Sequence, residues 1–562
     1  MKVVIVGGVA GGATAAARIR RLDETAEILI FERSGYISYA NCGLPYYVGG
    51  IITDPEELTL QTPESFFERF RVSVKVRHEV TALLPEEKCV LVKNLDSGEE
   101  FRECYDKLLL APGARPTVPR LEGAPSDRVF SLRTVEDTLR IAGFIDREQP
   151  RSAVLAGGGF ISLELAENLR GRGLDVTIVQ RPMQLMNPFD PEMAAFIHGE
   201  MRRSGVRLLL GRTVEGIRPD GDGLEVLLKD AEPVRADMAV MALGVTPDTE
   251  LARSAGLSLG VKGSIAVNER METSHKDIYA VGDAVQVKNL VTGEDTLISL
   301  AGPANKQARI AADNICGLDS RYEGSLGSSV VKLFDLTAAA TGVNETAAKK
   351  AGLAVDKLYL SPMDHAGYYP GGQVMTIKVV FDKHSWRLLG AQIVGGPGTD
   401  KRIDVLAAAV QMKMDVRALK DLQLAYAPPF SSAKDPVNLI GYMAENLSCG
   451  LVKNFHWDEL DALPRDGSAV LLDVRTPGEY ARGHGEGFVN IPVDELRQRL
   501  EEIPRGRSVY VNCQSGLRSY IACRILAQDG FDCYNLSGGW RLYSTAVHDI
   551  QAARAALPCG KE

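Results

Sequence analysis

The stretch that decides the fold is "KVVIVGGVAGGATAAARIRR", Lys2–Arg21. Its β-branched run predicts a strand that is buried on both faces of a parallel sheet. A glycine-rich turn and an alanine-rich helix come next, and a second strand ends at Glu32. Backbone N–H groups at such a turn bind a pyrophosphate while the acid holds a ribose, so this order predicts a dinucleotide-binding unit. The usual second glycine of the motif is Val9 here. The glycines of the turn are Gly7, Gly8, Gly11 and Gly12.

The same arrangement recurs in "SAVLAGGGFISLELAENLRGRGLDVTIVQR", Ser152–Arg181. Gly157 and Gly159 form the turn, and the second strand ends at Gln180. Two such units indicate two different dinucleotides. An acid at the end of the second strand would favour NADH, whereas Gln180 followed by Arg181 leaves NADH and NADPH equally open.

Three further segments occur in a recognisable order with these units: "LLLAPGARP" (108–116), "AVMALGVTPDTEL" (239–251) and "TSHKDIYAVGDAV" (273–285). Together they resemble the two-dinucleotide-fold flavoprotein reductases. In that superfamily the first unit binds FAD, the second binds NAD(P)H, and the aspartate matching Asp283 holds the ribityl-phosphate side of the flavin. The cofactor-binding positions expected from the motifs and the resemblance are Gly7, Gly8, Gly11, Gly12, Glu32, Arg33, Ala111, Gly113, Arg133, Gly157, Gly159, Ile161, Gln180, Gly244, Gly282 and Asp283.

One cysteine, Cys42, lies in "SYANCGLPYY" (Ser38–Tyr47), where glutathione-reductase-type enzymes carry Cys-x4-Cys. Pro45 fits the first turn of a helix that begins around Cys42 or Gly43. A thiol at a helix N-terminus has a pKa below its ordinary value of about 8.5, so we expect a reactive thiolate. The alternative is a buried structural cysteine.

This segment, read with "AYAPPFSSAKDPVN" (425–438), resembles the coenzyme A-disulfide reductase branch, which includes single-cysteine NAD(P)H oxidases, peroxidases and persulfide reductases. The resemblance covers residues 1 to about 445. It implies that Cys42 is the redox nucleophile beside the flavin and rests as a mixed disulfide with coenzyme A. Phe70 replaces a lysine expected to contact coenzyme A, although Arg71 adjoins it. The coenzyme A positions that the resemblance implies are Thr14, Arg18, Arg21, Ser38, Asn41, Asn305 and Lys434. Each arginine of the first helix also fits a solvated charged face.

Residues from about 325 to 445 resemble the dimerisation domain of this family, which places residues over the active site of the partner subunit. The segment therefore implies a homodimer with active sites completed across the interface. Tyr426 matches a family position, and Tyr368 in "HAGYYPGG" is the choice for a second tyrosine, with Tyr369 in reserve. A phenol can donate a hydrogen bond to a departing thiolate. Core packing is the alternative for an aromatic residue here.

The last hundred residues resemble a single rhodanese domain, through "AVLLDVR", "GHGEGFVNIP" and "SVYVNCQSGLRSYIACRILAQDGF". A strand delivers Cys513 to a turn that opens a helix, so backbone N–H groups surround its sulfur. Arg518 can pair with an anion held there. The loop is Cys-x4-Arg, shorter than the Cys-x5-Arg of tyrosine phosphatases, and this favours a persulfide over a phosphate. The remaining assignments are structural: Asp473 and Arg475 as an ion pair, Cys523 and Cys533 as core, and Cys559 as incidental.

Composition excludes several classes of protein. The 562 residues carry a formal net charge of −9, and no basic stripe indicates a nucleic-acid partner. No run approaches 18 apolar residues, so a membrane span is not expected. The nine cysteines are sparse and unpaired in spacing, which suits a reducing cytoplasm. Without Cys-x-x-Cys or His-Glu-x-x-His, no metal site is expected.

The expected architecture is α/β, with two dinucleotide-binding Rossmann-like domains, an α+β dimerisation domain and a C-terminal α/β rhodanese domain. The expected boundaries are 1–148 and 237–322 for the FAD-binding domain, 149–236 for the NAD(P)H-binding domain, 323–446 for dimerisation, 447–456 for a linker and 457–557 for rhodanese. We expect a reductase of coenzyme A persulfide, polysulfide and coenzyme A disulfide. The alternatives are an NAD(P)H oxidase or peroxidase cycling through a sulfenic acid, and a slow redox-sensing or sulfur-carrier protein.

Overall fold

The computed structural model describes residues 1–117 and 127–555, so Cys559 lies outside the described residues. The chain divides into two compact units. Unit 1 contains Met1–Arg181 and Gly205–Gly327, and unit 2 contains Pro182–Ser204 and the chain from Ser328 onward. Within the described ranges, none of the helices combines the length and apolarity needed to cross a bilayer.

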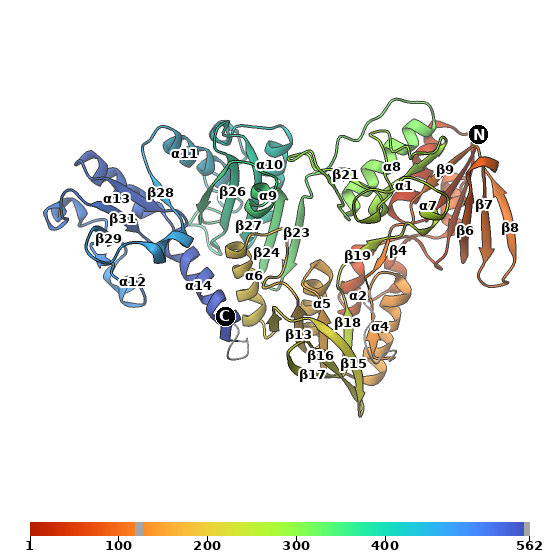
Figure 1. Cartoon of the computed structure of the whole chain (residues 1–562), viewed down its shortest axis with the longest axis horizontal. Helices are drawn as coiled ribbons and strands as arrows, with labels where there is room; N and C mark the ends of the chain where they lie inside the picture. The colour runs from red at the N-terminus through yellow and green to blue at the C-terminus, as the bar shows by residue number, and fades with distance from the viewer. Residues whose placement is uncertain (118–126, 556–562) are drawn as a thin grey trace. The chain divides into compact units, whose positions relative to one another are not determined.

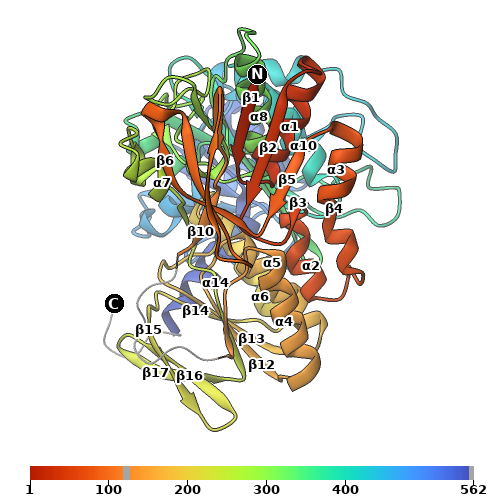
Figure 2. The same ribbon diagram turned by 90° about the vertical axis from the view of Figure 1, so that its right-hand side faces the viewer.

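The opening stretch forms the centre of a five-stranded parallel sheet in unit 1, in the order β20-β9-β1-β2-β5. Figure 2 shows β1, β2 and β5 of this sheet. Val3, Val4 and Ile5 of β1 are fully buried, as the sequence predicts for a strand covered on both faces. Helix α1 packs against α8. The bounds are β1 Lys2–Val6, β2 Glu27–Glu32, β5 Ser73–Val76, β9 Lys107–Leu110, β20 Ile278–Ala280, α1 Ala10–Leu22, α3 Pro63–Phe70 and α8 Ala301–Ile315.

The turn between β1 and α1 explains why the motif tolerates a valine. Gly7 has φ +97°, and a Cβ there would lie 2.2 Å from the carbonyl oxygen of Ala111. A Cβ on Gly12 would lie 1.8 Å from the carbonyl oxygen of Gly7. Val9, the N-cap of α1, has φ −99°, outside the left-handed region that favours glycine. The tight approach therefore requires Gly7 and Gly12, whereas no left-handed backbone demands a glycine at Val9.

A three-stranded antiparallel sheet, β6-β7-β8, corrects the expectation that the cysteines are unpaired. Cys89 begins β7 and lies directly opposite Cys104 at the end of β8, and the two form a disulfide. The sequence separation of 15 residues did not reveal this pair, because only the register of the two strands brings the side chains together. The bounds are β6 His78–Leu84, β7 Cys89–Asn94 and β8 Glu100–Cys104.

The second glycine-rich unit forms its own five-stranded parallel sheet in unit 1, in the order β11-β18-β12-β13-β14. Two of its strands, β11 and β18, come from outside residues 149–236. An antiparallel sheet of β15, β16 and β17 follows in sequence. The bounds are β11 Val129–Phe130, β12 Ser152–Ala156, β13 Asp175–Gln180, β14 Arg207–Leu210, β15 Val214–Asp220, β16 Gly223–Leu228, β17 Ala231–Ala236, β18 Met238–Met241, α4 Val135–Glu148 and α5 Phe160–Gly171.

Short elements complete unit 1. Three two-stranded sheets pair β3 with β4, β10 with β19 and β21 with β22. The bounds are β3 Ile37–Tyr39, β4 Thr59–Gln61, β10 Ala114–Pro116, β19 Val245–Pro247, β21 Val287–Lys288, β22 Asp295–Thr296, η1 Asn41–Gly43, α2 Leu44–Val48 and α7 Glu250–Ser254.

The first half of unit 2 is an antiparallel sheet, β23-β24-β27-β26-β25, with helices beside it (Figure 1). Helix α6 joins this unit although its residues lie between β13 and β14 in the sequence. The bounds are α6 Pro191–Arg203, β23 Ser329–Leu333, β24 Leu336–Gly342, α9 Glu345–Lys350, β25 Val355–Leu360, β26 Thr376–Asp382, β27 Leu388–Gly395, α10 Thr399–Gln411 and α11 Pro436–Ser448.

A buried ammonium group links α6 to the sheet. Lys378 on β26 is fully buried, and its Nζ lies 2.8 Å from Asp190, 2.5 Å from Glu192 and 2.8 Å from Glu345. Burial opposes the charge, but these three carboxylates raise the pKa of Lys378. The same carboxylates lie close enough together to ligate a metal ion, and the ammonium group takes that place.

The second half of unit 2 is a five-stranded parallel sheet in the order β28-β32-β31-β29-β30, drawn in blue in Figure 1. Its last helix, α14, packs on α6, where Asp549 contacts His198 at 2.7 Å and Arg202 at 2.5 Å. The bounds are β28 Asn454–Phe455, β29 Ala469–Asp473, α12 Pro477–Ala481, β30 Val489–Asn490, β31 Ser508–Asn512, α13 Leu517–Gln528, β32 Cys533–Leu536 and α14 Gly539–Ala555.

Candidate active sites

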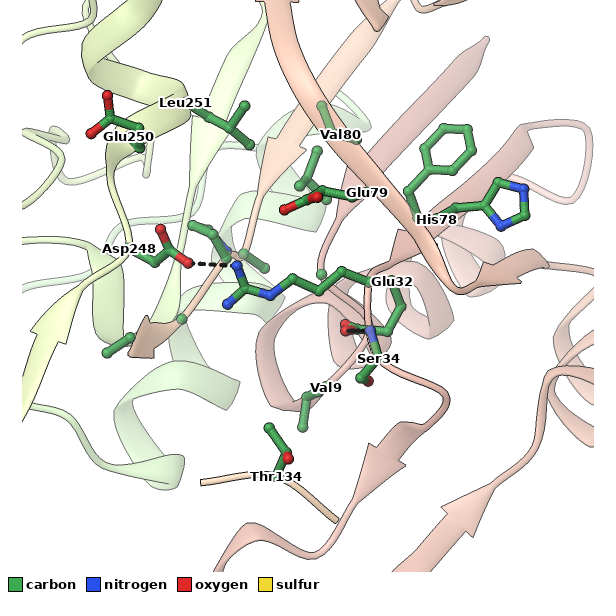
Figure 3. A pocket seen from close by; sticks show the side chains of 18 of the residues that line it. Val9, Glu32, Ser34, His78, Glu79, Val80, Thr134, Asp248, Glu250 and Leu251 are labelled. Atoms are coloured by element: carbon green, nitrogen blue, oxygen red, sulfur yellow. Dashed lines mark hydrogen bonds and ion pairs between the residues drawn. The ribbon is translucent and has the colours of Figure 1, made fainter. Parts of the chain in front are cut away.

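A cavity of about 370 Å³ opens at the carboxyl ends of β1, β2 and β9 in unit 1 (Figure 3). Ligands of open α/β sheets bind at this edge. Glu32 accepts hydrogen bonds from the N–H of Gly8 at 2.8 Å and of Ser34 at 2.9 Å. Each carboxylate oxygen keeps a lone pair for a ribose hydroxyl. The glycine turn and Glu32 thus fit a dinucleotide.

Two ion pairs border this cavity. Arg33 contacts Asp248 at 2.9 Å, the dashed line that ends at Asp248 in Figure 3. Arg133 contacts Asp283 at 2.6 Å, so two predicted cofactor residues far apart in sequence meet. Asn41 also lines the cavity, and its buried Oδ1 has no hydrogen-bond partner among the described residues. That acceptor is available to a bound molecule.

The other predicted cofactor residues lie at the ends of the two parallel sheets. Ala111 and Gly113 follow β9, Gly282 follows β20 and Gly244 follows β18. In the second unit, a Cβ on Gly157 would lie 2.1 Å from the carbonyl oxygen of Ala242, whereas Gly159 faces open space. Ile161 lies on α5 and Gln180 ends β13. The open face of the turn fits the approach of a second dinucleotide.

Cys42 lies in η1, directly before α2, and is free and exposed. Pro45 is in the first turn of α2, as predicted. The predicted lowering of the pKa of the Cys42 thiol is wrong. Partial burial, together with the carboxylates of Glu164 and Asp283, raises the pKa of the Cys42 thiol. These effects exceed the opposing charge of Arg133, and the helix α2 is only five residues long.

Glu164 is the residue that the sequence interpretation missed in unit 1. It lies on α5, near the hydroxyl of Tyr46 at 3.4 Å, and burial raises its pKa to about 7. It therefore changes charge near neutral pH beside Cys42. Its place in the first turns of the helix after a glycine motif was the only available signal.

The structure gives the predicted coenzyme A residues different surroundings. Thr14 Oγ1 lies 2.5 Å from Asn305 Oδ1, which joins α1 to α8. Arg18 is paired with Asp313 at 2.7 Å, so its charge is already neutralised. Arg21 is exposed on α1, and Ser38, with φ +44°, donates its N–H to the carbonyl oxygen of Gly8 at 2.9 Å. Lys434 is exposed in unit 2, where it lines a cavity.

The two predicted tyrosines of unit 2 meet. The hydroxyl oxygens of Tyr368 and Tyr426 lie 2.7 Å apart, and Tyr368 is 76% exposed. Their hydrogen bond raises the pKa of Tyr368, so its phenol stays protonated at neutral pH. Tyr369 instead packs its ring against His365. An exposed pair of phenols is unlike core packing.

Cys513 lies at the carboxyl end of β31, fully buried within its loop. The N–H of Gly516 donates to its Sγ at 3.1 Å. The hydroxyl of Ser519 lies 3.2 Å from Sγ and 2.6 Å from Oδ1 of Asn535. The N–H of Gly516 stabilises negative charge on the sulfur, whereas the single hydroxyl proton of Ser519 is shared between Sγ and Asn535 Oδ1. Among the described residues one backbone N–H, rather than the predicted succession, donates to Cys513 Sγ.

The sequence analysis expects Arg518 to pair with an anion held at the Cys513 loop. In the structure Arg518 is instead paired with a carboxylate of the protein. Its two terminal nitrogens donate to both carboxylate oxygens of Glu479, each at 2.7 Å. The Arg518 guanidinium lowers the pKa of Glu479 to about 2, so the pair stays charged. Asp473 and Arg475 form the predicted buried ion pair at 2.7 Å. Cys523 and Cys533 are buried as predicted.

The family model of pyridine nucleotide-disulphide oxidoreductases matches residues 1–308, and its dimerisation domain matches residues 328–436. The chain belongs to this family. A rhodanese-like domain matches residues 456–546. The protein is therefore a pyridine nucleotide-disulphide oxidoreductase with a C-terminal rhodanese domain, as the resemblance implied. This family uses FAD and a nicotinamide nucleotide, and the two glycine turns described above fit them.

Three relatives of this oxidoreductase bear on its substrates. Coenzyme A disulfide reductase of Staphylococcus aureus (strain JH9) is 37% identical over 445 residues, 79% of this chain and 100% of that protein. The crystal structure of reduced Bacillus anthracis CoADR-RHD has 46% identity and a TM-score of 0.94, with 98% of each chain covered. The structure of an NAD-dependent persulfide reductase from A. fulgidus has 37% identity and a TM-score of 0.90, covering 97% of this chain and 100% of that one.

Proposed function

We propose that this oxidoreductase reduces coenzyme A persulfide, polysulfide and coenzyme A disulfide through Cys42 alone, with NAD(P)H as the electron source. The observation that carries the proposal is the isolation of an accessible thiol beside the cofactor cavity. The other free cysteine among the described residues of unit 1 is Cys316. The charged groups around Cys316 are Asp23, Asp313 and Arg18, none of which acts on Cys42. These different surroundings support a small-molecule thiol as the disulfide partner of Cys42.

Cys42 rests as a mixed disulfide with coenzyme A. Bound FAD and NAD(P)H would supply the two electrons that break this disulfide into the Cys42 thiolate and coenzyme A. The thiolate then attacks the inner sulfur of a coenzyme A persulfide. A Cys42–coenzyme A bond forms, the S–S bond of the persulfide breaks, and hydrosulfide leaves with the electron pair. Each cycle consumes one NAD(P)H and releases one hydrogen sulfide and one coenzyme A.

Tyr368 and Tyr426 donate hydrogen bonds to the departing sulfur from the partner subunit of a homodimer. The 2.7 Å contact between their hydroxyl oxygens supports a shared role for the two tyrosines. Tyr368 is exposed and is therefore accessible to a partner subunit. A phenol that stays protonated is suited to stabilise a developing thiolate. The predicted cofactor positions and the coenzyme A positions Thr14, Asn305 and Lys434 belong to the same proposal.

Cys513 collects sulfane sulfur as a persulfide and passes it to the reductase site. The presence of both sulfur centres in one chain raises their effective concentration. The fusion favours persulfide reduction over disulfide reduction alone, because the reduction of coenzyme A disulfide does not need a carrier of sulfane sulfur.

Intact mass spectrometry tests the mixed disulfide. Protein purified without reductant is expected to lose about one coenzyme A mass per chain after reduction, because only Cys42 carries the adduct. Cys42→Ser is expected to lose both the adduct and sulfide release, and Cys316→Ser is the matched control that keeps both. Full sulfide release by the Cys42→Ser variant would refute the proposal.

The main rival is an NAD(P)H oxidase or peroxidase that cycles Cys42 through a sulfenic acid. Oxygen consumption and sulfide release, measured in one assay with coenzyme A persulfide, separate the two. NAD(P)H oxidation matched by oxygen uptake, without sulfide, would favour the oxidase.

A further inference from the structure

The charge of the Cys513 loop is balanced by a carboxylate from another element. Glu479 lies on α12, and its two oxygens engage both terminal nitrogens of Arg518 at 2.7 Å. Arg518 is the cation of the Cys-x4-Arg loop, so Glu479 occupies the place at which an anion would otherwise pair with it.

Glu479 is held in this position by a capping box. The N–H and the hydroxyl of Thr476 donate to its Oε2, each at 3.0 Å, and the N–H of Glu479 donates to Thr476 Oγ1 at 3.3 Å. The carboxylate is therefore preorganised rather than recruited by the arginine. Because the Arg518 guanidinium lowers its pKa to about 2, the Glu479 carboxylate is ionised at neutral pH.

The charges at the loop then add up to an anion. Within the loop and its carboxylate partner, the reacting thiolate form of Cys513 and Glu479 contribute two negative charges and Arg518 contributes one positive charge, while the nearby Asp473–Arg475 pair is neutral. A dianionic sulfur donor such as thiosulfate is repelled by this site, whereas a persulfide with an uncharged organic arm is not.

A cavity of about 430 Å³ beside the loop has room for such an arm. Gly516 and Leu517 of the loop, Tyr520 of α13 and Tyr442 of α11 line it, and Lys434 is the cation on its wall. Gly516 is also the residue whose N–H contacts Cys513 Sγ, so the cavity lies next to the reactive sulfur. Its largely apolar lining suits an organic group better than an oxyanion.

We propose that Glu479 is a specificity-determining residue that makes Cys513 accept sulfur from organic persulfides and reject thiosulfate. This deepens the proposed function and rests on it for the identity of the organic donor. In the accepted reaction the Cys513 thiolate attacks the terminal sulfur of the organic persulfide. The Cys513–sulfur bond forms, the S–S bond of the donor breaks, and the donor leaves as a thiolate. With thiosulfate the same attack would release sulfite.

The test measures thiocyanate formation from cyanide by the full-length enzyme, with thiosulfate or pantetheine persulfide as donor. This assay needs neither Cys42 nor NAD(P)H, so its failure and the failure of the reductase proposal are distinguishable. Glu479→Gln keeps the capping acceptor and removes the charge. It is expected to raise kcat/KM for thiosulfate about tenfold and to change that for pantetheine persulfide less than about twofold.

Three further variants separate charge from structure. Glu479→Asp keeps the charge on a shorter arm and is expected to leave thiosulfate a poor donor. Adding Arg518→Gln to Glu479→Gln is expected to abolish the gain. Glu459→Gln is the matched control, since Glu459 closes another capping box of the domain, and is expected to have no effect. An unchanged donor ratio in Glu479→Gln, or an equal loss with both donors, would overturn the proposal.

Discussion

At the scale of single residues, spacing identified the reactive groups and their surroundings decided their electrostatics. Cys42 was predictable as a lone thiol before a short helix, but its raised pKa was not, because Glu164 and Asp283 come from distant parts of the sequence. Glu479, the partner of Arg518, was not predictable for the same reason, because it is distant in the sequence. Thr476 and Glu479 form a local capping box, whereas the arginine that the Glu479 carboxylate meets lies 39 positions away in the sequence.

Glu164 is expected to control the reactivity of Cys42 in the reduced protein. Above pH 7 the ionised carboxylate disfavours the Cys42 thiolate, and below pH 7 the neutral acid does not. Glu164→Gln is therefore expected to alkylate about two- to threefold faster at pH 8 and to lack the inflection near pH 7. Peptide mass spectrometry after iodoacetamide measures this, with Cys316 as an internal control. Identical pH profiles would contradict the assignment.

At the scale of elements, periodicity identified strands and helices well, whereas pairings between elements depended on packing. The run "KVVIV" forms a doubly covered central strand. The Cys89–Cys104 disulfide follows from the register of β7 and β8, which no local pattern reveals. Helix α6 is attached to unit 2 through Lys378, a contact between residues that are almost 190 positions apart.

Lys378→Met is expected to lower the free energy of unfolding of unit 2 by about 3–5 kcal/mol. The substitution leaves Asp190, Glu192 and Glu345 buried together without their cation. Thermal unfolding followed by circular dichroism measures the loss.

Arg499→Met is the control for this prediction. It removes an ion pair with Glu495 and Glu502 at the surface, where solvent screens the charges, and is expected to change the free energy of unfolding far less than Lys378→Met does. Equal losses of unfolding free energy in the two variants would show that the buried cluster stabilises the protein no more than a surface ion pair does.

At the scale of the whole molecule, the proposed active site combines Cys42 of one subunit with the two tyrosines of the other. Hybrid dimers test this arrangement. One subunit carries Cys42→Ser, and the other carries Tyr368→Phe with Tyr426→Phe. A site completed across the interface leaves one of the two sites intact, so the hybrid is expected to regain about half of the wild-type activity. Differently tagged subunits are co-expressed and purified for the assay.

The two parental homodimers serve as controls, and each is expected to be impaired. If the tyrosines acted within their own subunit, the hybrid would contain no intact site. Activity no greater than the mean of the parents would then exclude a shared active site.

The sequence by itself determined the order of the dinucleotide-binding units, the lone Cys42 and the short Cys513 loop. These depend on local spacing, because a glycine turn, a helix start or a six-residue loop is set by neighbouring residues. Only the tertiary structure decided the pairing of Cys89 with Cys104, the contact of Tyr368 with Tyr426 and the carboxylate that neutralises Arg518. Each of these joins side chains that are distant in sequence, and their electrostatics follow from burial and distance, which chain folding alone establishes.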